Sequence, residues 1–400
     1  MPVDRTRRFV LPGIQDLNKD QDEALALPLE GQHLIIGGPG TGKSVVALLR
    51  ARRLAQEQKK YRILVYNHLL NGSNRHLFGF TEPLRSNTWE KWFRDMYRHI
   101  FRKSVPTILQ ENPSAYRPIE WNAVEEDVSS IKEGTELPLN MDFYLLIDEG
   151  QDMPPQFYSA LVGWGAENFY VVADQNQQLQ PDKCSSRQDI ENALAINTKD
   201  TLELITNYRN TRPIAQLAQH FYAASPASPR PDLPDSKSTA TSPELWAYGA
   251  IGQQSLSEIA EGILKLSDRF PSKLIGIITP DNRIREKFYD ALAEARPKLD
   301  NGRPPIQTFV SGQQEPLDFG QGGIMVINAQ SCKGLEFDIA ILADIDQNKP
   351  KNDIYALKSR FYVMVARGRE QVILLRTGNT CPVVESLLPT DSTVLFRKEQ

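Results

Sequence analysis

Residues 37–44 read Gly-Gly-Pro-Gly-Thr-Gly-Lys-Ser, and this stretch limits the possible folds of the chain more than any other. It matches the phosphate-binding pattern G-x-x-x-x-G-K-[ST], which requires a strand before it and a helix after it. The apolar run His33–Ile36 predicts the strand, and Ser44–Ala55 has the pattern of a helix. The sequence therefore predicts an α/β domain with a phosphate-binding loop, and a chance glycine turn is the weaker interpretation.

The loop sequence also indicates which ligand it holds. Glycines let backbone N–H groups close around phosphate oxygens, and the N-terminus of the following helix adds a favourable potential. In loops of this pattern the lysine contacts the β- and γ-phosphates, and the last hydroxyl binds Mg²⁺. We therefore expect ATP and Mg²⁺ as ligands. The expected nucleotide-binding residues of the loop are Gly37, Gly38, Pro39, Gly40, Thr41, Gly42, Lys43 and Ser44, and Ser44 is also an expected metal ligand.

The composition excludes few functions. A length of 400 residues suggests two or three domains. The formal net charge is −4, so a nucleic-acid partner would require a local basic surface. The three cysteines have no metal-like spacing and fit a reducing compartment. No apolar run approaches the about 18 residues of a membrane-spanning helix, and the chain start does not resemble a secretory signal, so we expect no membrane and a cytoplasmic location.

Apolar runs separated by helical stretches occur on both sides of a Pro/Ser-rich segment at residues 224–243. Such runs are typical of parallel strands that are buried on both faces. The pattern predicts a parallel sheet covered by helices in the first half of the chain, and a second α/β unit without a phosphate-binding loop. The expected strands are residues 63–66, 143–147, 169–173, 245–248, 274–279, 324–327 and 339–342, and the expected helices of the second unit are residues 258–266 and 283–295.

Acidic and amide residues directly follow two of these strands. Asp148 and Glu149 come after residues 143–147, and Gln177 follows residues 169–173. Because the carboxyl ends of parallel strands face the ligand crevice, we expect Asp148 to hold the Mg²⁺ shell and Glu149 to orient or deprotonate an attacking water. Gln177 is placed to sense the γ-phosphate. The alternatives are a solvated acidic turn and a polar loop.

Further short motifs follow in order along nearly the whole chain. The stretches that carry them are Leu17–Gln21, residues 37–44, Val65–His68, Asn87–Trp89, Asp148–Asp152, Asp174–Gln177, Asn207–Asn210, Asn328–Phe337 and Tyr362–Arg369. Together they resemble, in this order, the N-terminal glutamine motif and motifs I, Ia, Ib, II, III, IV, V and VI of superfamily 1 helicases, closest to the UvrD/Rep branch. The resemblance implies two RecA-like domains, expected at residues 1–205 and 206–400.

The resemblance also implies roles for single residues around the nucleotide. Gln21 would contact adenine, Tyr208 would stack on it, and Glu336 would lie near the ribose. Arg209 and Arg367 would reach the γ-phosphate from the second domain, where guanidinium groups stabilise the charge of the transferring phosphoryl group. Gln177 would couple that phosphate to the nucleic-acid groove. For the two arginines the alternative is a surface salt bridge.

Single-stranded DNA is the partner that the resemblance implies, crossing the top of both domains. Aromatic faces stack on bases, and cationic or amide groups hold phosphates. The alternative for the aromatic residues is packing in the core, and a basic cluster from Arg50 to Lys60 is expected to be a solvated helix face. The expected nucleic-acid residues are Tyr66, Asn67, Thr88, Trp89, Asn328, Gln330 and Lys333.

The chain departs from the family pattern in several places. Gln330 replaces a histidine of motif V, Ala366 replaces a threonine of motif VI, and residues 178–181 lack the aromatic side chains of the UvrD branch. Only residues 313–323 stand where that branch inserts a large accessory domain. Between motifs Ib and II, residues of about 95–139 leave room for a small insertion. The sequence therefore predicts a nearly bare two-domain motor core.

Two functions remain open at the level of sequence. The first is an enzyme, a nucleic-acid-stimulated ATPase that moves along single-stranded DNA, with or without unwinding a duplex. The second is an ATP-dependent switch or sensor subunit of a repair or phage-defence complex, in which a partner such as a nuclease performs the chemistry. A non-enzymatic relic is disfavoured because the lysine, the carboxylates and both arginines of the motifs are intact.

Overall fold

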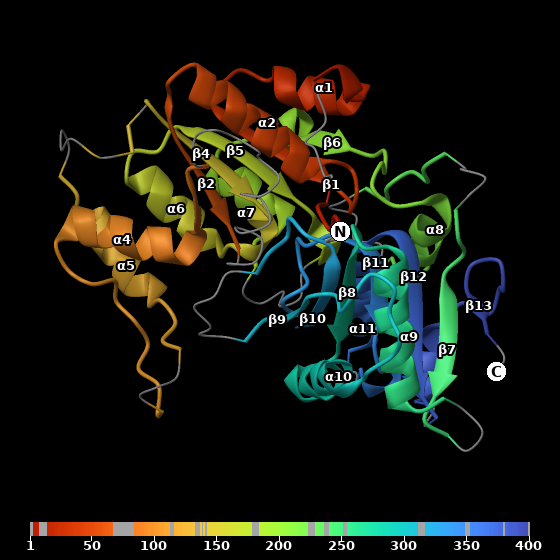
Figure 1. The fold of residues 1–400 in the computed structure, drawn as a ribbon. Coiled ribbons are helices and arrows are strands. Elements are labelled where there is room, and N and C mark those ends of the chain that lie inside the picture. Colours follow the sequence, from red (N-terminus) through yellow and green to blue (C-terminus); the bar gives the residue numbers. More distant parts are fainter. Residues whose placement is uncertain are drawn as a thin grey trace.

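Two parallel β-sheets form the centre of the protein, one in each half of the chain (Figure 1). All pairs of neighbouring strands in both sheets are parallel. The predicted fold class of two parallel-sheet α/β domains is therefore confirmed. The computed structural model describes residues 3–7, 14–66, 84–112, 116–132, 137, 139–140, 142–177, 184–222, 229–235, 240–250, 254–310, 317–348, 353–378 and 381–398.

The first domain is built on a six-stranded sheet. In spatial order its strands are β3 (Ser86–Thr88), β2 (Lys60–Val65), β4 (Phe143–Asp148), β5 (Asn168–Ala173), β1 (Gln32–Gly37) and β6 (Leu202–Leu204). Parallel neighbours need crossover connections, and helices supply several of them. The helices of this domain are α1 (Lys19–Ala26), α2 (Lys43–Gln56), α4 (Trp89–Phe101), α5 (Trp121–Ser129), α6 (Pro155–Gly163) and α7 (Arg187–Ala193).

The second domain is built on a seven-stranded sheet. In spatial order its strands are β13 (Phe396–Arg397), β7 (Glu244–Tyr248), β12 (Gly368–Thr377), β11 (Phe337–Leu342), β8 (Leu274–Thr279), β10 (Gly323–Asn328) and β9 (Ile306–Thr308). Its helices are α8 (Arg212–His220), α9 (Leu256–Arg269), α10 (Asn282–Glu294), α11 (Ile354–Val365) and α12 (Pro382–Leu387). Single-turn 3-10 helices occur at residues 14–16, 150–152, 175–177, 198–200 and 345–347.

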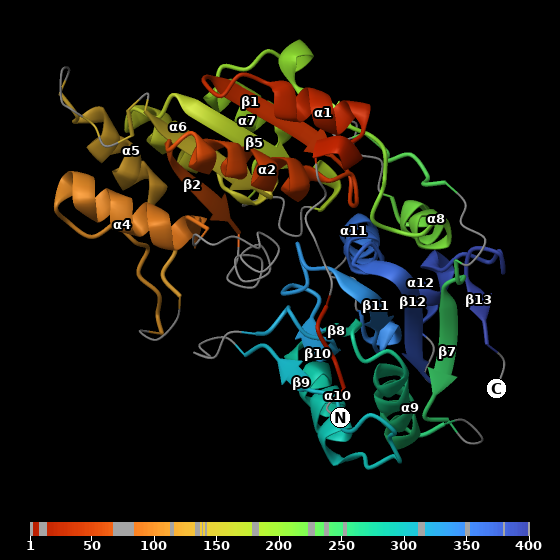
Figure 2. The same ribbon diagram turned by 45° about the horizontal axis from the view of Figure 1, so that its top comes forward.

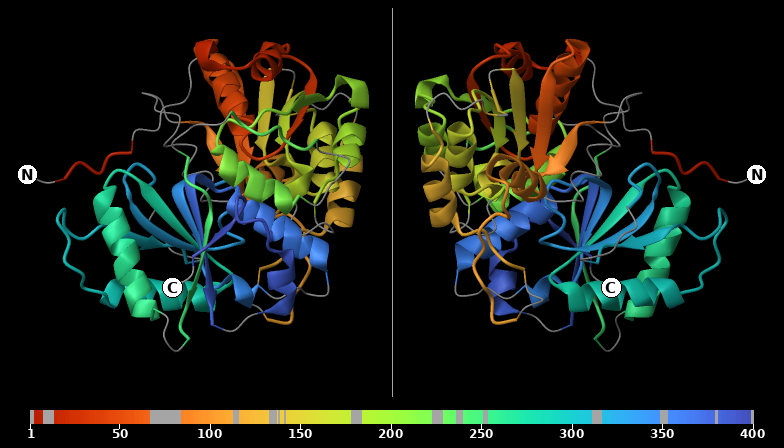
Figure 3. Two further views of the ribbon diagram at one scale, coloured as in Figure 1. Left: turned by 90° about the vertical axis from the view of Figure 1, so that its right-hand side faces the viewer. Right: turned by 90° about the vertical axis from the view of Figure 1, so that its left-hand side faces the viewer.

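Helices cover both faces of each sheet, as Figure 3 shows from two sides, and apolar clusters fill the space between helices and sheets. In the first domain α1 and α2 pack on one face, and α4, α5, α6 and α7 pack on the other. In the second domain α9 and α10 cover one face, and α8, α11 and α12 cover the other. This two-sided burial explains why the strands are near-continuous apolar runs, which is the pattern that made them predictable.

Every strand and helix expected from the apolar pattern is present, with ends shifted by a few residues. The pattern missed β12, the ten-residue strand that follows motif VI. Its first residues, Arg369 to Gln371, are polar, and the register shifts between Phe337 and Ile339 of its neighbour β11. It also missed β3 and β6, because three residues are too few to show a period.

The insertion expected near residues 95–139 is a helical layer that packs on the first domain. The ring of Trp89 lies 6.5 Å from that of Trp121 and 5.3 Å from that of Phe157, measured between centroids. Trp92 is buried in the same cluster. Core packing, the alternative to a base-stacking role, is therefore what these tryptophans do in this structure.

Arg50 corrects the expectation of a solvated basic helix face. It is 2% exposed, and its guanidinium donates to the carbonyl oxygens of Leu27 and Pro28. The guanidinium also lies 4.3 Å from the centre of the Tyr170 ring. Burial lowers the pKa of Arg50 to about 10. Arg50 therefore joins α2 to the chain after α1 and to β5, although Arg52 and Arg53 on the same helix are exposed.

The N-terminal segment of residues 3–7 lies on the second domain, whereas α1 belongs to the first (Figure 2). Thr6 pairs with Gln321 in an antiparallel bridge, and the Arg7 Nε atom lies 3.1 Å from a carboxylate oxygen of the buried Asp338. The chain therefore passes between the domains at this segment as well as near residue 205. No helix among the described residues is both long and apolar enough to cross a membrane.

Phe93 offers a test of the helical layer. It is fully buried, with its ring 4.7 Å from Trp164. Phe93→Ala would leave a cavity, so we expect the free energy of unfolding to fall by about 3–5 kcal/mol in urea denaturation followed by circular dichroism. Leu109→Ala, at a side chain that is 79% exposed, is the control and should change it by less than about 0.5 kcal/mol. Equal effects of the two substitutions would contradict this packing.

Candidate functional site

The candidate site lies where three neighbouring strands of the first sheet end. β4, β5 and β1 are adjacent, so the segments that follow them meet at one edge of the sheet. The loop 37–44 follows β1, the acidic pair follows β4, and Asp174–Gln177 follow β5. The edge formed by the carboxyl ends of parallel strands is the usual ligand position in such sheets. The structure thus brings together the three motifs of the first domain that the sequence singled out.

The conformation of the loop requires glycine at two positions. Gly40 and Gly42 have φ angles of 77° and 89°, in the left-handed region that side chains disfavour. A Cβ atom on Gly40 would lie 2.2 Å from Asn207 Oδ1, and one on Gly42 would lie 2.2 Å from Gln21 Nε2. The loop is therefore packed closely on both sides, and its glycines leave space for these two amides.

Gln21 reaches the loop from the start of α1. Its backbone N–H donates to the side-chain oxygen of the capping residue Asn18, and its Nε2 donates to the carbonyl of Thr41 at 3.0 Å. Gln21 is 6% exposed. The residue expected to contact adenine therefore lies against the predicted phosphate-binding loop, held there by a helix cap.

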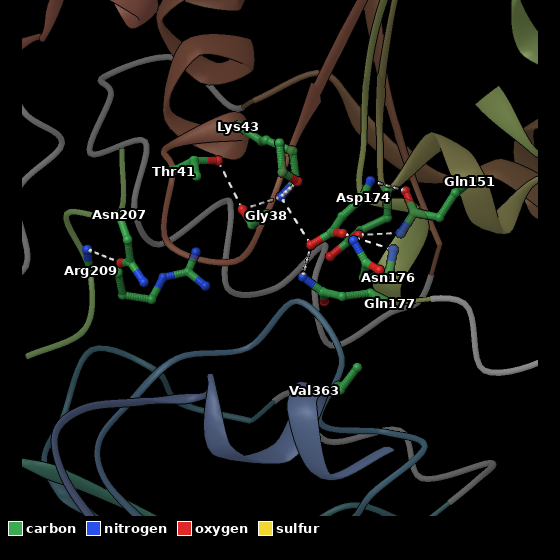
Figure 4. A network of polar contacts seen from close by, with 12 residues as sticks. Gly38, Thr41, Lys43, Gln151, Asp174, Asn176, Gln177, Asn207, Arg209 and Val363 are labelled. Carbon is green, nitrogen blue, oxygen red and sulfur yellow. Dashed lines mark hydrogen bonds and ion pairs between the residues drawn. The ribbon is translucent and has the colours of Figure 1, made fainter. Parts of the chain in front are cut away.

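Lys43 is buried inside the loop. Its Nζ donates to the carbonyl oxygens of Gly37 and Gly38, each at 2.8 Å, and lies 3.7 Å from Asp174 Oδ2 (Figure 4). Burial lowers the pKa of Lys43, although the carboxylate of Asp174 opposes that shift. The ammonium group is therefore held by the loop carbonyls and a single carboxylate, which an anionic ligand could replace.

The two carboxylates after β4 differ in their surroundings. Burial raises the pKa of Asp148 to about 6, and the charge of Glu149 adds to the shift. Burial alone would raise the pKa of Glu149. The positive charges of Lys333, Lys43 and Arg367 together have the larger effect, so the pKa of Glu149 is lowered. The backbone of Glu149 has a φ of 57°, a strained conformation for a residue with a side chain. Glu149 is thus poised as an ionised carboxylate.

Asp148 has the features of a metal ligand. Its Oδ2 is buried and has no hydrogen-bond partner among the residues that the structure describes. Ser44 acts on the same carboxyl group, lowering its pKa. No group of three or more acidic, His or Cys side chains suited to a metal occurs in the described parts of the chain. A Mg²⁺ ion held by Ser44 and Asp148 would therefore take its other ligands from water and phosphate, as this ion commonly does.

Gln177 is the centre of a polar network that links the two domains (Figure 4). Its Nε2 donates to Asp174 Oδ2 at 2.6 Å. Its Oε1 accepts from Arg367 of the second domain, also at 2.6 Å, and its backbone oxygen accepts from Lys333 at 2.5 Å. Since Asp174 also faces Lys43, a continuous polar path runs from the loop of the first domain to motif VI of the second.

The second domain contributes two buried cations through two of its connections. Arg367 follows α11, is 1% exposed, and donates to Val363 O as well as to Gln177. Lys333 lies between β10 and β11, is 2% exposed, and its Nζ lies 2.6 Å from Asp152 Oδ1. Both face the acidic edge of the first sheet. Opposite charges on the two domains therefore meet in a buried interface.

The segment after β6 contacts both domains. The Tyr208 N–H donates to the Gly40 carbonyl at 2.8 Å, and the Asn210 Nδ2 donates to the carbonyls of Ala366 and Gly368. The Arg209 side chain lies below the loop (Figure 4). Its guanidinium forms a 2.5 Å ion pair with Glu336. The Tyr208 side chain is 53% exposed. This segment thus carries the expected stacking residue and one expected arginine to the phosphate-binding loop.

Several of the expected nucleic-acid residues that the structure describes are buried or packed on other elements. Lys333 is a correction, because it is buried between the domains and its ammonium is engaged by Asp152 and Gln177. Thr88 is 7% exposed and Trp89 packs on the helical layer, while Asn67 lies outside the described residues. Tyr66, Trp89 and Asn328 are partly accessible, and Gln330 is exposed.

Sequence reasoning missed several residues that shape the site. Gln151 donates to Glu149 Oε2 at 2.6 Å and accepts from the Asp174 N–H, so it orients the expected base. It lies within the acidic motif, which was the available signal. Pro231 packs on Gly38, where an added Cβ would lie 2.0 Å from its Cγ. No pattern in the Pro/Ser-rich segment indicated that contact.

Comparison with known proteins adds little to this description. No family model and no curated protein matches the sequence. Among solved structures, the C-terminal domain of a possible DNA helicase from Lactobacillus plantarum WCFS1 is similar, with a TM-score of 0.32 and 16% identity over 48% of this chain and 99% of that domain. A likeness this weak concerns the fold alone.

Gly42→Ala tests the loop geometry. The new Cβ would combine a strained φ with a collision with Gln21, so we expect nucleotide affinity to fall at least about tenfold, or 1.4 kcal/mol. Titration with a fluorescent ATP analogue measures it. Gly249→Ala is a matched control, because Gly249 has a φ of 86° and nothing within 4 Å of the added atom. Unchanged affinity of the Gly42 variant would contradict this assignment.

Proposed function

We propose that this protein is an ATPase that hydrolyses ATP to ADP and phosphate at the interface of its two domains and uses the cycle to move along single-stranded DNA. The observation that carries the proposal is the buried path from Lys43 through Asp174 and Gln177 to Arg367. This path connects Lys43 of the first domain, which would bind phosphate, to a guanidinium group of the second domain. Such an interface suits a ligand that bridges the domains.

The residues present fit ATP and Mg²⁺. The backbone of the loop and the N-terminus of α2 would hold the phosphates, and Lys43 would leave its carbonyl partners to join them. Ser44 and the unpartnered Oδ2 of Asp148 would hold the ion, which when bound neutralises phosphate charge. Gln21, expected to contact adenine, lies against Gly42, and Tyr208, expected to stack on it, is bound to Gly40 through its backbone.

Glu149 supplies the base for the reaction. In hydrolysis the oxygen of a water molecule bonds to the γ-phosphorus, the bond from that phosphorus to the β–γ bridging oxygen breaks, and ADP leaves with the electron pair. The proton of the water passes to Glu149, whose lowered pKa keeps it ionised and whose Oε2 is held by Gln151. Arg209 and Arg367 would stabilise charge on the transferring group.

Movement on DNA would follow from opening and closing of the interface. ATP adds negative charge where cations of both domains converge, so binding favours the closed arrangement and loss of phosphate weakens it. Tyr66 in the first domain and Asn328 with Gln330 in the second are at least partly accessible and lie among the residues expected to contact the strand. Neutral amides and an aromatic ring fit contacts that do not depend on base sequence.

Lys43→Ala tests the site assignment. The variant loses the ammonium that would contact the phosphates, so we expect ATP turnover to fall by at least about 10³-fold, or 4 kcal/mol of transition-state stabilisation. A coupled assay of ADP release measures it. Lys298→Ala, at an exposed lysine far from the site in sequence, is the control. Hydrolysis by Lys43→Ala at the wild-type rate would refute the assignment.

Displacement of streptavidin from single strands tests the motor. We expect single-stranded DNA to raise kcat several-fold, and streptavidin to be displaced from only one end of strands biotinylated at either end, because a translocating motor has one direction. The Lys43→Ala variant is the negative control. Stimulated hydrolysis without displacement would instead favour the alternative, an ATP-dependent switch subunit that serves a partner such as a nuclease.

A further inference from the structure

Lys333 forms a buried ion pair that joins the two domains. Its Nζ lies 2.6 Å from Asp152 Oδ1 and 2.5 Å from the backbone oxygen of Gln177. The side chains of Lys333 and Asp152 are 2% and 5% exposed. One ammonium group therefore fixes the segment after β4 and the segment after β5 against the second domain.

A buried pair of this kind does little for stability. Removing both charges from water costs free energy that their attraction only partly offsets. A pair of apolar residues of similar size often stabilises a protein at least equally well. Buried polar groups can instead define one arrangement of packed parts. The pair exists only while the domains are in contact, so it specifies their relative orientation.

Lys333 is rigidly connected to an accessible edge of the second domain. It lies on the eight-residue connection from β10 to β11, residues 329–336. Ala329, Cys332 and Leu335 of this connection are buried in the core with α8 and α11. The N–H groups of Ser331 and Cys332 are bound to Asn328. Gln330, on the same turn, is exposed.

We propose that Lys333 is a positioning residue that transmits contacts at the Asn328–Gln330 edge to Asp152 and Gln177, beside Glu149. The connection moves with the second domain because its apolar side is anchored in that core. A strand bound at this edge therefore sets the domain orientation, and Lys333 passes that orientation to the catalytic segments. This role rests on the proposed function, and it replaces the direct nucleic-acid contact expected from the sequence.

Arg367 differs from Lys333 in what it contacts. Arg367 binds the Gln177 side chain, which also binds Asp174 next to Lys43. Lys333 binds a backbone oxygen and Asp152 instead. A ligand that draws Arg367 toward the loop would therefore leave the contacts of Lys333 in place. The two cations can respond to different ligands.

Three variants separate the possible roles of Lys333. Lys333→Met removes the cation, Lys333→Met with Asp152→Asn removes both charges, and Lys298→Met changes an exposed lysine as a control. For each, we would measure the thermal midpoint, the dissociation constant for single-stranded DNA and its salt dependence, and the ratio of DNA-stimulated to basal ATPase rate. Hydrogen exchange of residues 149–153 and 175–177 with and without DNA is a readout that needs no turnover.

We expect Lys333→Met to bind DNA within about twofold of wild type with the same salt dependence, and we expect its ratio of DNA-stimulated to basal ATPase rate to fall from several-fold to nearly one. The double variant should regain the thermal midpoint but not the stimulation. Recovery of stimulation in the double variant would show that Lys333 only neutralises the charge of Asp152, and it would overturn the proposal. A weaker affinity with a salt slope smaller by about one would identify a phosphate contact and also overturn it.

Hydrogen exchange separates this inference from the proposed function. If wild type shows no stimulated ATPase, the motor proposal fails. DNA-dependent protection of residues 149–153 that is present in wild type and lost in Lys333→Met would still support the positioning role. No effect of DNA on exchange in wild type, or an equal effect in both proteins, would overturn the inference whatever the ATPase result.

Discussion

Pairing of buried charges across the domain interface is the constraint on which the candidate site depends. The first domain presents four carboxylates, Asp148, Glu149, Asp152 and Asp174, and all four are nearly inaccessible. Their own loop supplies one cation, Lys43. Isolated buried carboxylates are costly, so the cations of the second domain are required for this edge to remain ionised. The domain contact and the charge state of the site are therefore linked.

This linkage explains why each expected phosphate-binding cation has a protein partner. Lys43 is held by loop carbonyls, Arg209 by Glu336, and Arg367 by Gln177. A polyanionic ligand would exchange these contacts for contacts with itself, and would shift the equilibrium only by its difference in affinity for the two arrangements. Contacts that are satisfied yet replaceable are the physical basis of a switch. A site whose groups had no partners would instead be unstable without the ligand.

The fold was predictable from the sequence, whereas the surroundings of the charged residues were not. Strand, loop and helix around residues 37–44 are local, and the buried strands are long enough to show their apolar character. Whether Arg50 or Lys333 faces water depends on Tyr170 or Asp152, which lie more than a hundred residues away in the chain. The packing of Trp89 likewise depends on a residue of another helix, Trp121. Single-residue patterns carry no information about such partners.

The short connection between β10 and β11 determines how the interface can move. Parallel strands are commonly joined by a helix, but here eight residues cross the sheet and three of them are anchored in its core. Such a connection has little freedom to shift alone, so a force at Gln330 acts on the whole second domain. The coupling free energy between the DNA edge and the catalytic segments is limited because a buried ion pair contributes little net free energy. Coupling free energies of about 1–3 kcal/mol are typical of linked sites. A stronger lock would hold the domains closed, and a weaker one would not transmit the contact.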